Sequence, residues 1–267
     1  MNSHQGLATN KRDDIVSFRS STEPHQQQAK RIIPKVIYQT WRTKILPESI
    51  QLVRKHVKSL NPDYDLQLFD DKDISDYIGR NFSKKVFNAF KQLNSGAARA
   101  DFWRYCILWN EGGIYLDIDS RISKNIDELI NPSDQFIVTR EGNPEYFNNW
   151  ILISCPRHPI LLECIVSCCD NIHNKRSNNT CLLTGPWGPY TKAINIFAKT
   201  YAEPGKTPYQ TNDEYINSQT LHKNSPVKFR FYGQDLNEYG IYKHTYHEDL
   251  YKTNTHWSQQ TALKGSQ

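Results

Sequence analysis

Residues 94–113, NSGAARADFWRYCILWNEGG, constrain the fold more than any other part of the chain. Asn94 or Ser95 can cap a helix at its start, and Gly112 can end it. Nearly every position between them is apolar, and a helix that is apolar on almost all sides is buried in a large core. We therefore expect a domain whose other elements cover this helix.

Arg99, Asp101 and Arg104 interrupt the apolar stretch, and the last two form a pair of opposite charge. They are three positions apart, so they lie on one face of it. An unpaired charge is costly to bury, so each of them needs a partner. Either the two pair with each other and serve only the structure, or their face opens onto a polar ligand.

The segment after the helix combines a short strand with two aspartates. Residues 114–116 predict the strand, and Asp117 and Asp119 follow it. Ligands of open α/β sheets bind at the carboxyl ends of strands, and strand side chains alternate with a period of two. We expect both carboxylates to point the same way, where Mg²⁺ or Mn²⁺ shared with a phosphate would relieve their repulsion. A solvated turn is the alternative for an isolated Asp-x-Asp.

The chain before the buried helix alternates between strand and helix patterns. Residues 36–38 predict a strand, and apolar residues at a spacing of three to four predict a helix that begins at Pro47. Residues 64–69 alternate like a strand, and the acid-rich segment 70–73, Asp-Asp-Lys-Asp, opens a further helix. This order is typical of an α/β domain with parallel strands.

The composition places much of the polarity outside the core. Only 37% of the 267 residues are hydrophobic, yet 12% are aromatic, which excludes general disorder. Residues 1–31 are polar and without periodicity, so we predict a disordered tail there and a single domain over residues 32–267. The remaining polar residues would then line a solvent-filled cleft.

Three further patterns limit the function. Cys164, Cys168 and Cys169 lie at helical spacing among apolar residues and lack the other ligands of a metal site, so we assign them to the core.

The longest apolar run has about five residues and no secretory signal is visible, so we expect a protein of the cytoplasm, or of the inner face of a membrane with only peripheral contact. The net charge of +5 without a basic stripe argues against a nucleic-acid partner.

Residues 97–119, AARADFWRYCILWNEGGIYLDID, resemble the sugar-binding region of family 32 glycosyltransferases. These are the Och1-like mannosyltransferases, which are related to the catalytic domains of clostridial glucosylating toxins. The family pattern is an Asp, an Arg three residues later, a hydrophobic helix, Gly-Gly-Ile-Tyr and Asp-x-Asp, and each element is present here. The similarity extends over IPKVIYQTW at 33–41, over Asn149 to His158-Pro159, and over Thr-Gly-Pro at 184–186.

The resemblance implies a GT-A type α/β fold, a Rossmann-like sheet that binds a nucleotide sugar with the help of Mn²⁺ or Mg²⁺. It also implies a role for each matching residue. Trp41 would stack on the base, Asp101 would accept hydrogen bonds from sugar hydroxyls, and Arg104 would touch the sugar or the diphosphate. Tyr115 would line the nucleotide pocket, Asp117 would contact the ribose or a metal-bound water, and Asp119 would bind the metal.

Further positions of the pattern complete the predicted site. Substrate contacts are also expected from Gln39, Gly113, Asn149 and Trp257, and the acceptor is expected against residues 148–158 and 184–190. The family closes with a His and a Ser-Trp, for which this chain offers His244, His247 and His256-Trp257. We take His247 as the third metal ligand, with a solvated polar tail as the alternative.

The predicted function is that of a retaining, divalent-metal-dependent glycosyltransferase. It would move a hexose from a UDP- or GDP-sugar to a glycan or a lipid-linked saccharide, with Asp101, Arg104, Asp117 and Asp119 as catalytic residues. One alternative is an effector that glycosylates a protein side chain. Another is a module that binds nucleotide sugars or carbohydrates without turnover.

Overall fold

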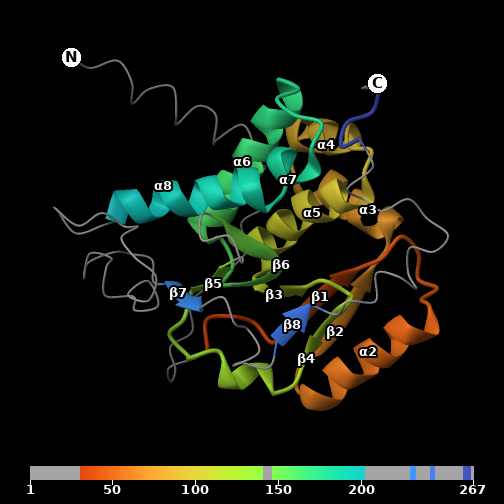
Figure 1. The fold of residues 1–267 in the computed structure, drawn as a ribbon, viewed down its shortest axis with the longest axis vertical. Coiled ribbons are helices and arrows are strands. Elements are labelled where there is room, and N and C mark those ends of the chain that lie inside the picture. The colour runs from red at the N-terminus through yellow and green to blue at the C-terminus, as the bar shows by residue number, and fades with distance from the viewer. Residues whose placement is uncertain (1–30, 141–145, 202–228, 233–240, 244–260, 266–267) are drawn as a thin grey trace.

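The computed structural model describes residues 31–140, 146–201, 229–232, 241–243 and 261–265 (Figure 1). The predicted tail, residues 1–31, lies outside the described residues except for Arg31. The guanidinium of Arg31 pairs with Asp127 and lies 5.2 Å from the centre of the Tyr64 ring. Arg31 is therefore anchored to the folded domain.

The described residues form helices and strands that alternate through the first half of the chain. In chain order the elements are β1 (Val36–Thr40), α2 (Glu48–Leu60), β2 (Asp65–Phe69), α3 (Asp71–Asn81), α4 (Lys84–Lys91), α5 (Gly96–Glu111), β3 (Gly113–Leu116), β4 (Ser120–Ile122), η1 (Ile126–Glu128), β5 (Phe136–Arg140), β6 (Phe147–Ser154), α6 (Pro159–His173), α7 (Thr180–Leu183), η2 (Pro186–Tyr190), α8 (Thr191–Tyr201), β7 (Phe229–Tyr232) and β8 (Ile241–Lys243).

A six-stranded sheet with the order β2-β1-β3-β6-β5-β7 forms the centre of the fold. The strands β2, β1 and β3 run parallel, as the strand–helix rhythm predicts. The whole sheet is mixed, because β6 runs antiparallel to both β3 and β5. Only six residues, 141–146, separate β5 from β6, and a parallel pairing needs a crossover of a dozen or more residues, so the two strands pair as neighbours of opposite direction.

Helices cover both faces of this sheet. Figure 1 shows α2 on one side and the helices α3 to α8 on the other. Successive strand residues accordingly enter two different cores: Tyr38 and Tyr115 pack with the larger group of helices, whereas Ile37 and Ile114 pack with α2. Both faces of β1 and β3 are therefore buried, as in doubly covered α/β sheets.

The helix ends follow the capping patterns in most respects. The Asp70 side chain accepts hydrogen bonds from the backbone N–H groups of Lys72 and Asp73 and starts α3. Gly112 ends α5 with a φ of 67°. The expected capping hydrogen bond at the start of α5 is absent, since Ser95 occupies the N-cap position without accepting a backbone N–H group. Burial of ten α5 residues, rather than its cap, therefore holds this helix.

The remaining helix predictions agree with the structure. All six cysteines are reduced and buried, including the three on α6, so the core assignment is confirmed. Within the described ranges, every helix is too short or too polar to cross a membrane. Residues 261–265 return to the α4–α5 connection, where the Ala262 carbonyl accepts a hydrogen bond of 2.8 Å from the Asn94 backbone N–H.

Candidate active site at the end of strand β3

The Asp-x-Asp motif lies in a turn directly after β3. The strand ends at Leu116, and the backbone carbonyl of Asp117 accepts a hydrogen bond of 2.9 Å from the N–H of Ser120. The period-two argument for the direction of Asp117 and Asp119 is therefore wrong, because these residues are not extended. The Asp117 backbone N–H donates to the carbonyl of Trp150 at 2.8 Å, which ties the turn to β6.

The structure brings Asp101 and Arg104 of α5 together with this turn. Arg104 Nη2 lies 3.2 Å from Asp101 Oδ1 and 3.3 Å from Asp117 Oδ1. The Arg104 side chain is 5% exposed, so the interaction is shielded from water. Asp101 and Arg104 thus pair with each other, and the same guanidinium also holds the first aspartate of the motif. The pairing of the two helix charges is therefore confirmed, and the opening of this face onto a polar ligand stays a prediction.

Arg104 is held on further sides by the protein itself. Its Nη1 donates a hydrogen bond of 2.6 Å to the carbonyl of Asn149, and its Nε donates one of 3.3 Å to the carbonyl of Ala100. The guanidinium carbon lies 4.1 Å from the centre of the Tyr115 ring. The Tyr115 hydroxyl in turn donates to Asp117 Oδ1 at 2.8 Å. Arg104 and Tyr115 therefore fix the position of Asp117.

The Asp101 carboxylate receives hydrogen bonds from two other parts of the chain. Asn149 Nδ2 donates to Oδ1 at 3.0 Å, and the Thr184 hydroxyl donates to Oδ2 at 3.3 Å. A Cβ atom on Gly185 would lie 3.0 Å from Asp101 Oδ2. The Thr-Gly-Pro step thus packs directly against the Asp101 carboxylate. The absence of a side chain on Gly185 allows the backbone to come this close.

Burial changes the acidity of Asp101. Removal from water raises the pKa of its carboxyl to about 6, although the nearby Arg104 guanidinium acts in the opposite direction. The neighbouring Asp117 carboxylate adds to the upward shift. Asp101 is therefore an acceptor whose charge is sensitive to pH near neutrality.

Trp41 lies beside the Asp-x-Asp turn. It is partly buried against a small apolar cluster that contains Ile50 and Ile118, the central residue of the motif. The Arg42 guanidinium lies 5.5 Å from the centre of the Trp41 ring. The predicted base-stacking residue and the predicted metal ligands are therefore neighbours.

Gln39 and Gly113, also predicted substrate contacts, are buried within the sheet. Gln39 is 0% exposed, and its side-chain carbonyl accepts a hydrogen bond from Arg54. Gly113 has a φ of 105°, and a Cβ atom on it would lie 2.9 Å from the Val36 carbonyl. The geometry thus gives Gly113 a packing role between β1 and β3.

The segment expected to face the acceptor is partly internal. His158 is 1% exposed, its ring lies 4.5 Å from that of Phe136, and its Nδ1 accepts a hydrogen bond from the Ile160 backbone N–H. Burial lowers the pKa of His158 to about 3, so the ring is neutral. His158 therefore caps α6 and does not belong to an acceptor surface.

Thr184 is predicted only within the segment expected to face the acceptor, and Tyr105 is missing from the predicted site. Thr184 is part of the family-like Thr-Gly-Pro step, but nothing local in the sequence indicates its partner Asp101. Tyr105, whose hydroxyl accepts a hydrogen bond of 3.1 Å from Asn149 Nδ2, follows Asp101 by four positions. Helical spacing places Tyr105 and Asp101 on one face, and this signal could have identified the tyrosine.

The metal site is only partly within the described residues. His244, His247, His256 and Trp257 lie outside them. In the described part of the chain, no three His, Cys, Asp or Glu side chains gather in an arrangement that could hold a metal ion. Asp117 and Asp119 nevertheless offer carboxylate oxygens, which suit Mg²⁺ or Mn²⁺, and the Asp117 side chain retains 18% exposure.

Comparison with known proteins supports this arrangement. Residues 47–137 match the family profile described as "Glycosyltransferase sugar-binding region containing DXD motif". Inositol phosphoceramide mannosyltransferase 3 of Schizosaccharomyces pombe is 31% identical over 133 residues, which are 50% of this chain and 36% of the relative. Mannosyl phosphorylinositol ceramide synthase CSH1 of Saccharomyces cerevisiae is 32% identical over 137 residues, which are 51% of this chain and 35% of the relative. The chain spans about a third of the length of these relatives.

A solved structure shares the fold. The PaToxG glycosyltransferase superposes with a TM-score of 0.51 at 22% identity, over 61% of this chain and 69% of that protein. This likeness confirms the predicted GT-A type α/β fold. The profile match covers α2 to β3 and the Asp-x-Asp turn, which include Asp101, Arg104, Asp117 and Asp119. Residues 47–137 therefore match the DXD-containing sugar-binding region of glycosyltransferases, as the sequence resemblance predicts.

Proposed function

We propose that this protein is a retaining glycosyltransferase that transfers a hexose from a nucleotide sugar to a glycan or a lipid-linked saccharide. The observation that carries the proposal is the contact of Arg104 with both Asp101 and Asp117. This contact joins the two halves of the family pattern, which are 16 positions apart in the sequence, in one partly shielded cluster. The names of the relatives make mannose, supplied as GDP-mannose, the first donor to test.

The donor would bind with its diphosphate at the Asp-x-Asp turn. Asp117 and Asp119 would hold a divalent cation, with His247 as a third ligand from outside the described residues. The bound cation would supply positive charge for the leaving diphosphate. Trp41, which lies beside the turn, would stack on the base.

The buried cluster would prepare the sugar side of the site. Arg104 and Tyr115 keep Asp117 in place, and Asn149 and Thr184 orient the Asp101 carboxylate. Asp101 would then accept hydrogen bonds from hydroxyls of the hexose. Polar groups that are fixed before the substrate arrives need no reorganisation during the reaction. Such preorganisation is usually the largest contribution of polar groups to catalysis.

The reaction itself needs no protein nucleophile. The oxygen of an acceptor hydroxyl would form a bond to the anomeric carbon while the bond from that carbon to the diphosphate oxygen breaks. The diphosphate would leave with the bonding electron pair and take up the hydroxyl proton on a phosphate oxygen. If the acceptor oxygen attacks the same face of the hexose ring from which the diphosphate departs, the anomeric configuration is retained.

The names of relatives, which refer to inositol phosphoceramide, support a choice of acceptor class. We therefore propose a lipid-linked acceptor with a sugar or polyol headgroup. An effector that glycosylates a protein would instead label lysate proteins from a radioactive donor, and mass spectrometry of those proteins would detect this outcome.

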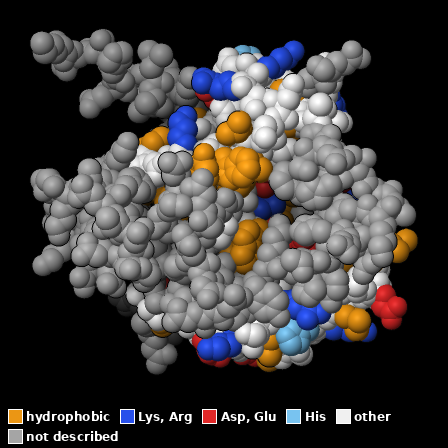
Figure 2. Space-filling view, viewed as in Figure 1, with side chains coloured by type: hydrophobic (Ala, Val, Ile, Leu, Met, Phe, Trp, Pro, Cys, Tyr) orange, Lys and Arg blue, Asp and Glu red, His pale blue; other side chains and the backbone are white. Residues whose placement is uncertain are grey.

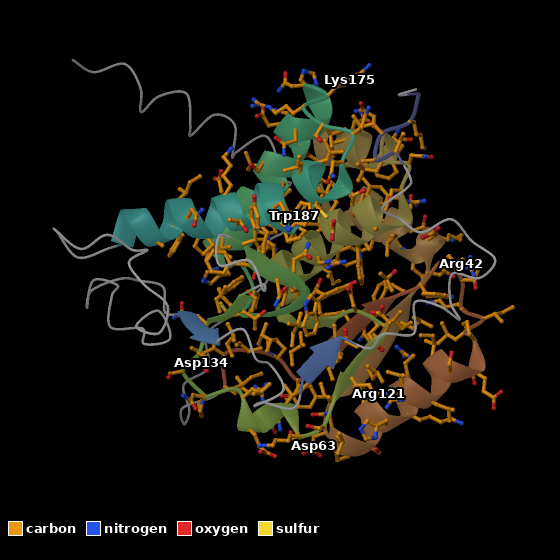
Figure 3. All side chains as sticks on the ribbon, viewed as in Figure 1. Arg42, Asp63, Arg121, Asp134, Lys175 and Trp187 are labelled. Atoms are coloured by element: carbon orange, nitrogen blue, oxygen red, sulfur yellow. The ribbon has the colours of Figure 1, made fainter. Side chains whose placement is uncertain are left out.

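The test is a panel of UDP- and GDP-sugars with and without Mn²⁺, in which release of the nucleoside diphosphate is measured. We expect one donor to be hydrolysed with Mn²⁺, and Asp117→Ala and Asp119→Ala to reduce this at least a hundredfold. Asp63→Ala is a matched control, because the Asp63 side chain is 74% exposed (labelled in Figure 3). Full activity of both motif variants, or no turnover of a bound donor, would refute the proposed transfer.

A further inference from the structure

An exposed tryptophan, Trp187, contacts a partly buried tyrosine, Tyr146, and both belong to segments that contact Asp101. Trp187, in the segment η2, is 42% exposed, and its ring centre lies 5.7 Å from that of Tyr146 with 36° between the planes. Figure 3 shows Trp187 near the middle of the face in view, and Figure 2 shows hydrophobic and charged side chains close together in the middle of the same face. Large aromatic side chains are mostly covered in a folded domain, so this one requires an explanation.

A rigid segment holds Trp187 in this position. Pro186 and Pro189 restrict the backbone on both sides of it. A Cβ atom on Gly188 would lie 2.1 Å from the Leu182 carbonyl, so η2 is pressed against α7. Tyr190, the other aromatic residue of the segment, is fully buried. The exposure of the indole is therefore a feature of a fixed turn and not of a loose loop.

Both ends of η2 connect to the residues around Asp101. At its start, Thr184 donates a hydrogen bond to Asp101, and Trp187 follows Thr184 by three positions, which limits their Cα separation to about 11 Å. At its end, the Tyr190 ring lies 6.1 Å from that of Tyr105 and nearly parallel to it. The segment that carries the indole is thus tied at both ends to residues around Asp101.

The second ring of the pair is anchored to the same cluster. Tyr146 directly precedes β6, whose first residue, Phe147, donates a backbone hydrogen bond of 3.2 Å to the Thr191 hydroxyl. Three positions after Tyr146, Asn149 donates to Asp101. Two segments that both contact Asp101 therefore bring Tyr146 and Trp187 together.

We infer that Trp187, supported by Tyr146, binds the ring of the acceptor, and that this acceptor is a six-membered polyhydroxylated ring. The axial C–H groups of such a ring form an apolar face that matches an indole, while its hydroxyls stay at the edge, where they can reach water or polar side chains. This inference rests on the proposed function and specifies its acceptor. A protein side chain offers no such ring, so the aromatic pair favours a saccharide or cyclitol headgroup.

The test separates transfer to a ring from hydrolysis of the donor. The probes are methyl α-mannoside and myo-inositol, each added to the full chain with the donor and Mn²⁺. We expect Trp187→Ala to reduce kcat/KM for transfer to one of these rings at least tenfold while donor hydrolysis and donor KM stay unchanged. Trp187→Phe should restore most of the loss, and Leu52→Ala, which removes a 58% exposed side chain on α2, should have no effect.

A second measurement keeps the inference testable without turnover. Methyl α-mannoside or myo-inositol should change the tryptophan fluorescence of the wild-type protein and not that of Trp187→Phe. Wild-type transfer by Trp187→Ala, equal losses of transfer and hydrolysis, or identical fluorescence titrations would overturn the inference. Absence of donor hydrolysis in the wild type would refute the proposed function instead, and the fluorescence titration would still decide on ring binding.

Discussion

Arg104 Nη2 lies 3.3 Å from Asp117 Oδ1, so a residue in the most buried helix is paired with the first aspartate of the Asp-x-Asp turn. The same nitrogen lies 3.2 Å from Asp101. One guanidinium thus links the helix that organises the core to the turn that would bind the diphosphate. Asp101 depends on it most, because its carboxylate is buried and would otherwise be a poorly compensated charge.

Replacement of Arg104 should therefore be costly. We predict that Arg104→Met lowers the free energy of unfolding by about 3–5 kcal/mol, since it leaves Asp101 and Asp117 without their cation. Arg99→Met is the control on the same helix: Arg99 is 25% exposed and lies 3.8 Å from Asp71, and such pairs contribute only about 0–1 kcal/mol. Urea unfolding of both variants checks this. Equal losses for the two arginines would contradict it.

The raised pKa of Asp101 predicts a pH dependence of stability. The folded-state pKa of about 6 lies above the value of about 3.9 in an unfolded chain, so the folded protein binds the extra proton between these values. The free energy of unfolding should then fall as the pH rises from about 4 to about 6, by up to about 3 kcal/mol.

The variant Asp101→Asn isolates this effect, because it cannot ionise. Its stability relative to the wild type should increase between pH 4 and pH 7, while its donor turnover is lost. Unfolding curves at several pH values measure the difference. A constant gap between the two proteins across this range would show that Asp101 does not titrate as described.

The Tyr115 hydroxyl offers a finer test of how Asp117 is held. Tyr115→Phe keeps the ring over Arg104 but removes the hydrogen bond to Asp117. We predict a tenfold to hundredfold loss of Mn²⁺ affinity or donor turnover, the usual effect of losing a group that orients a metal ligand. Tyr190→Phe is the control, since the Tyr190 hydroxyl has no hydrogen-bond partner within the described residues. Equal activity of the two phenylalanine variants would count against the positioning role.

Gly113 should prove to be structural and not a substrate contact. Gly113→Ala places a Cβ atom 2.9 Å from the Val36 carbonyl at a φ of 105°, so we predict a loss of more than about 1 kcal/mol of stability. Gly96→Ala, in the first turn of α5, meets nothing within 4 Å and should be neutral or slightly stabilising. Thermal unfolding compares them. Reduced donor affinity in Gly113→Ala at unchanged stability would instead support a substrate contact.

Local patterns predict much of this fold, because their causes are local. The apolar stretch of α5, its Gly112 end and the acidic start of α3 act over a few residues, and each appears where it is expected. The antiparallel entry of β6 between β3 and β5 is different. It depends on pairing with strands elsewhere in the chain, and no short segment encodes that choice.

The same distinction applies to the candidate site. The family pattern identifies Asp101, Arg104 and Asp117, and the structure places them in contact. Their partners are distant: the Asn149 carbonyl lies 45 positions from Arg104, and Thr184 lies 83 positions from Asp101. Spacing along one helix cannot indicate such partners. The turn at Asp117 is the alternative that the sequence leaves open, and it replaces the period-two prediction because the strand ends at Leu116.

The most direct test of the central claim is calorimetric titration of the full chain with GDP-mannose in the presence and absence of Mn²⁺. The claim is that Asp117 and Asp119 bind a nucleotide sugar through a divalent cation. It predicts saturable binding that requires Mn²⁺ and is abolished in Asp117→Asn and Asp119→Asn but retained in Asp63→Asn. Binding of equal strength without Mn²⁺, or in the two motif variants, would contradict the claim.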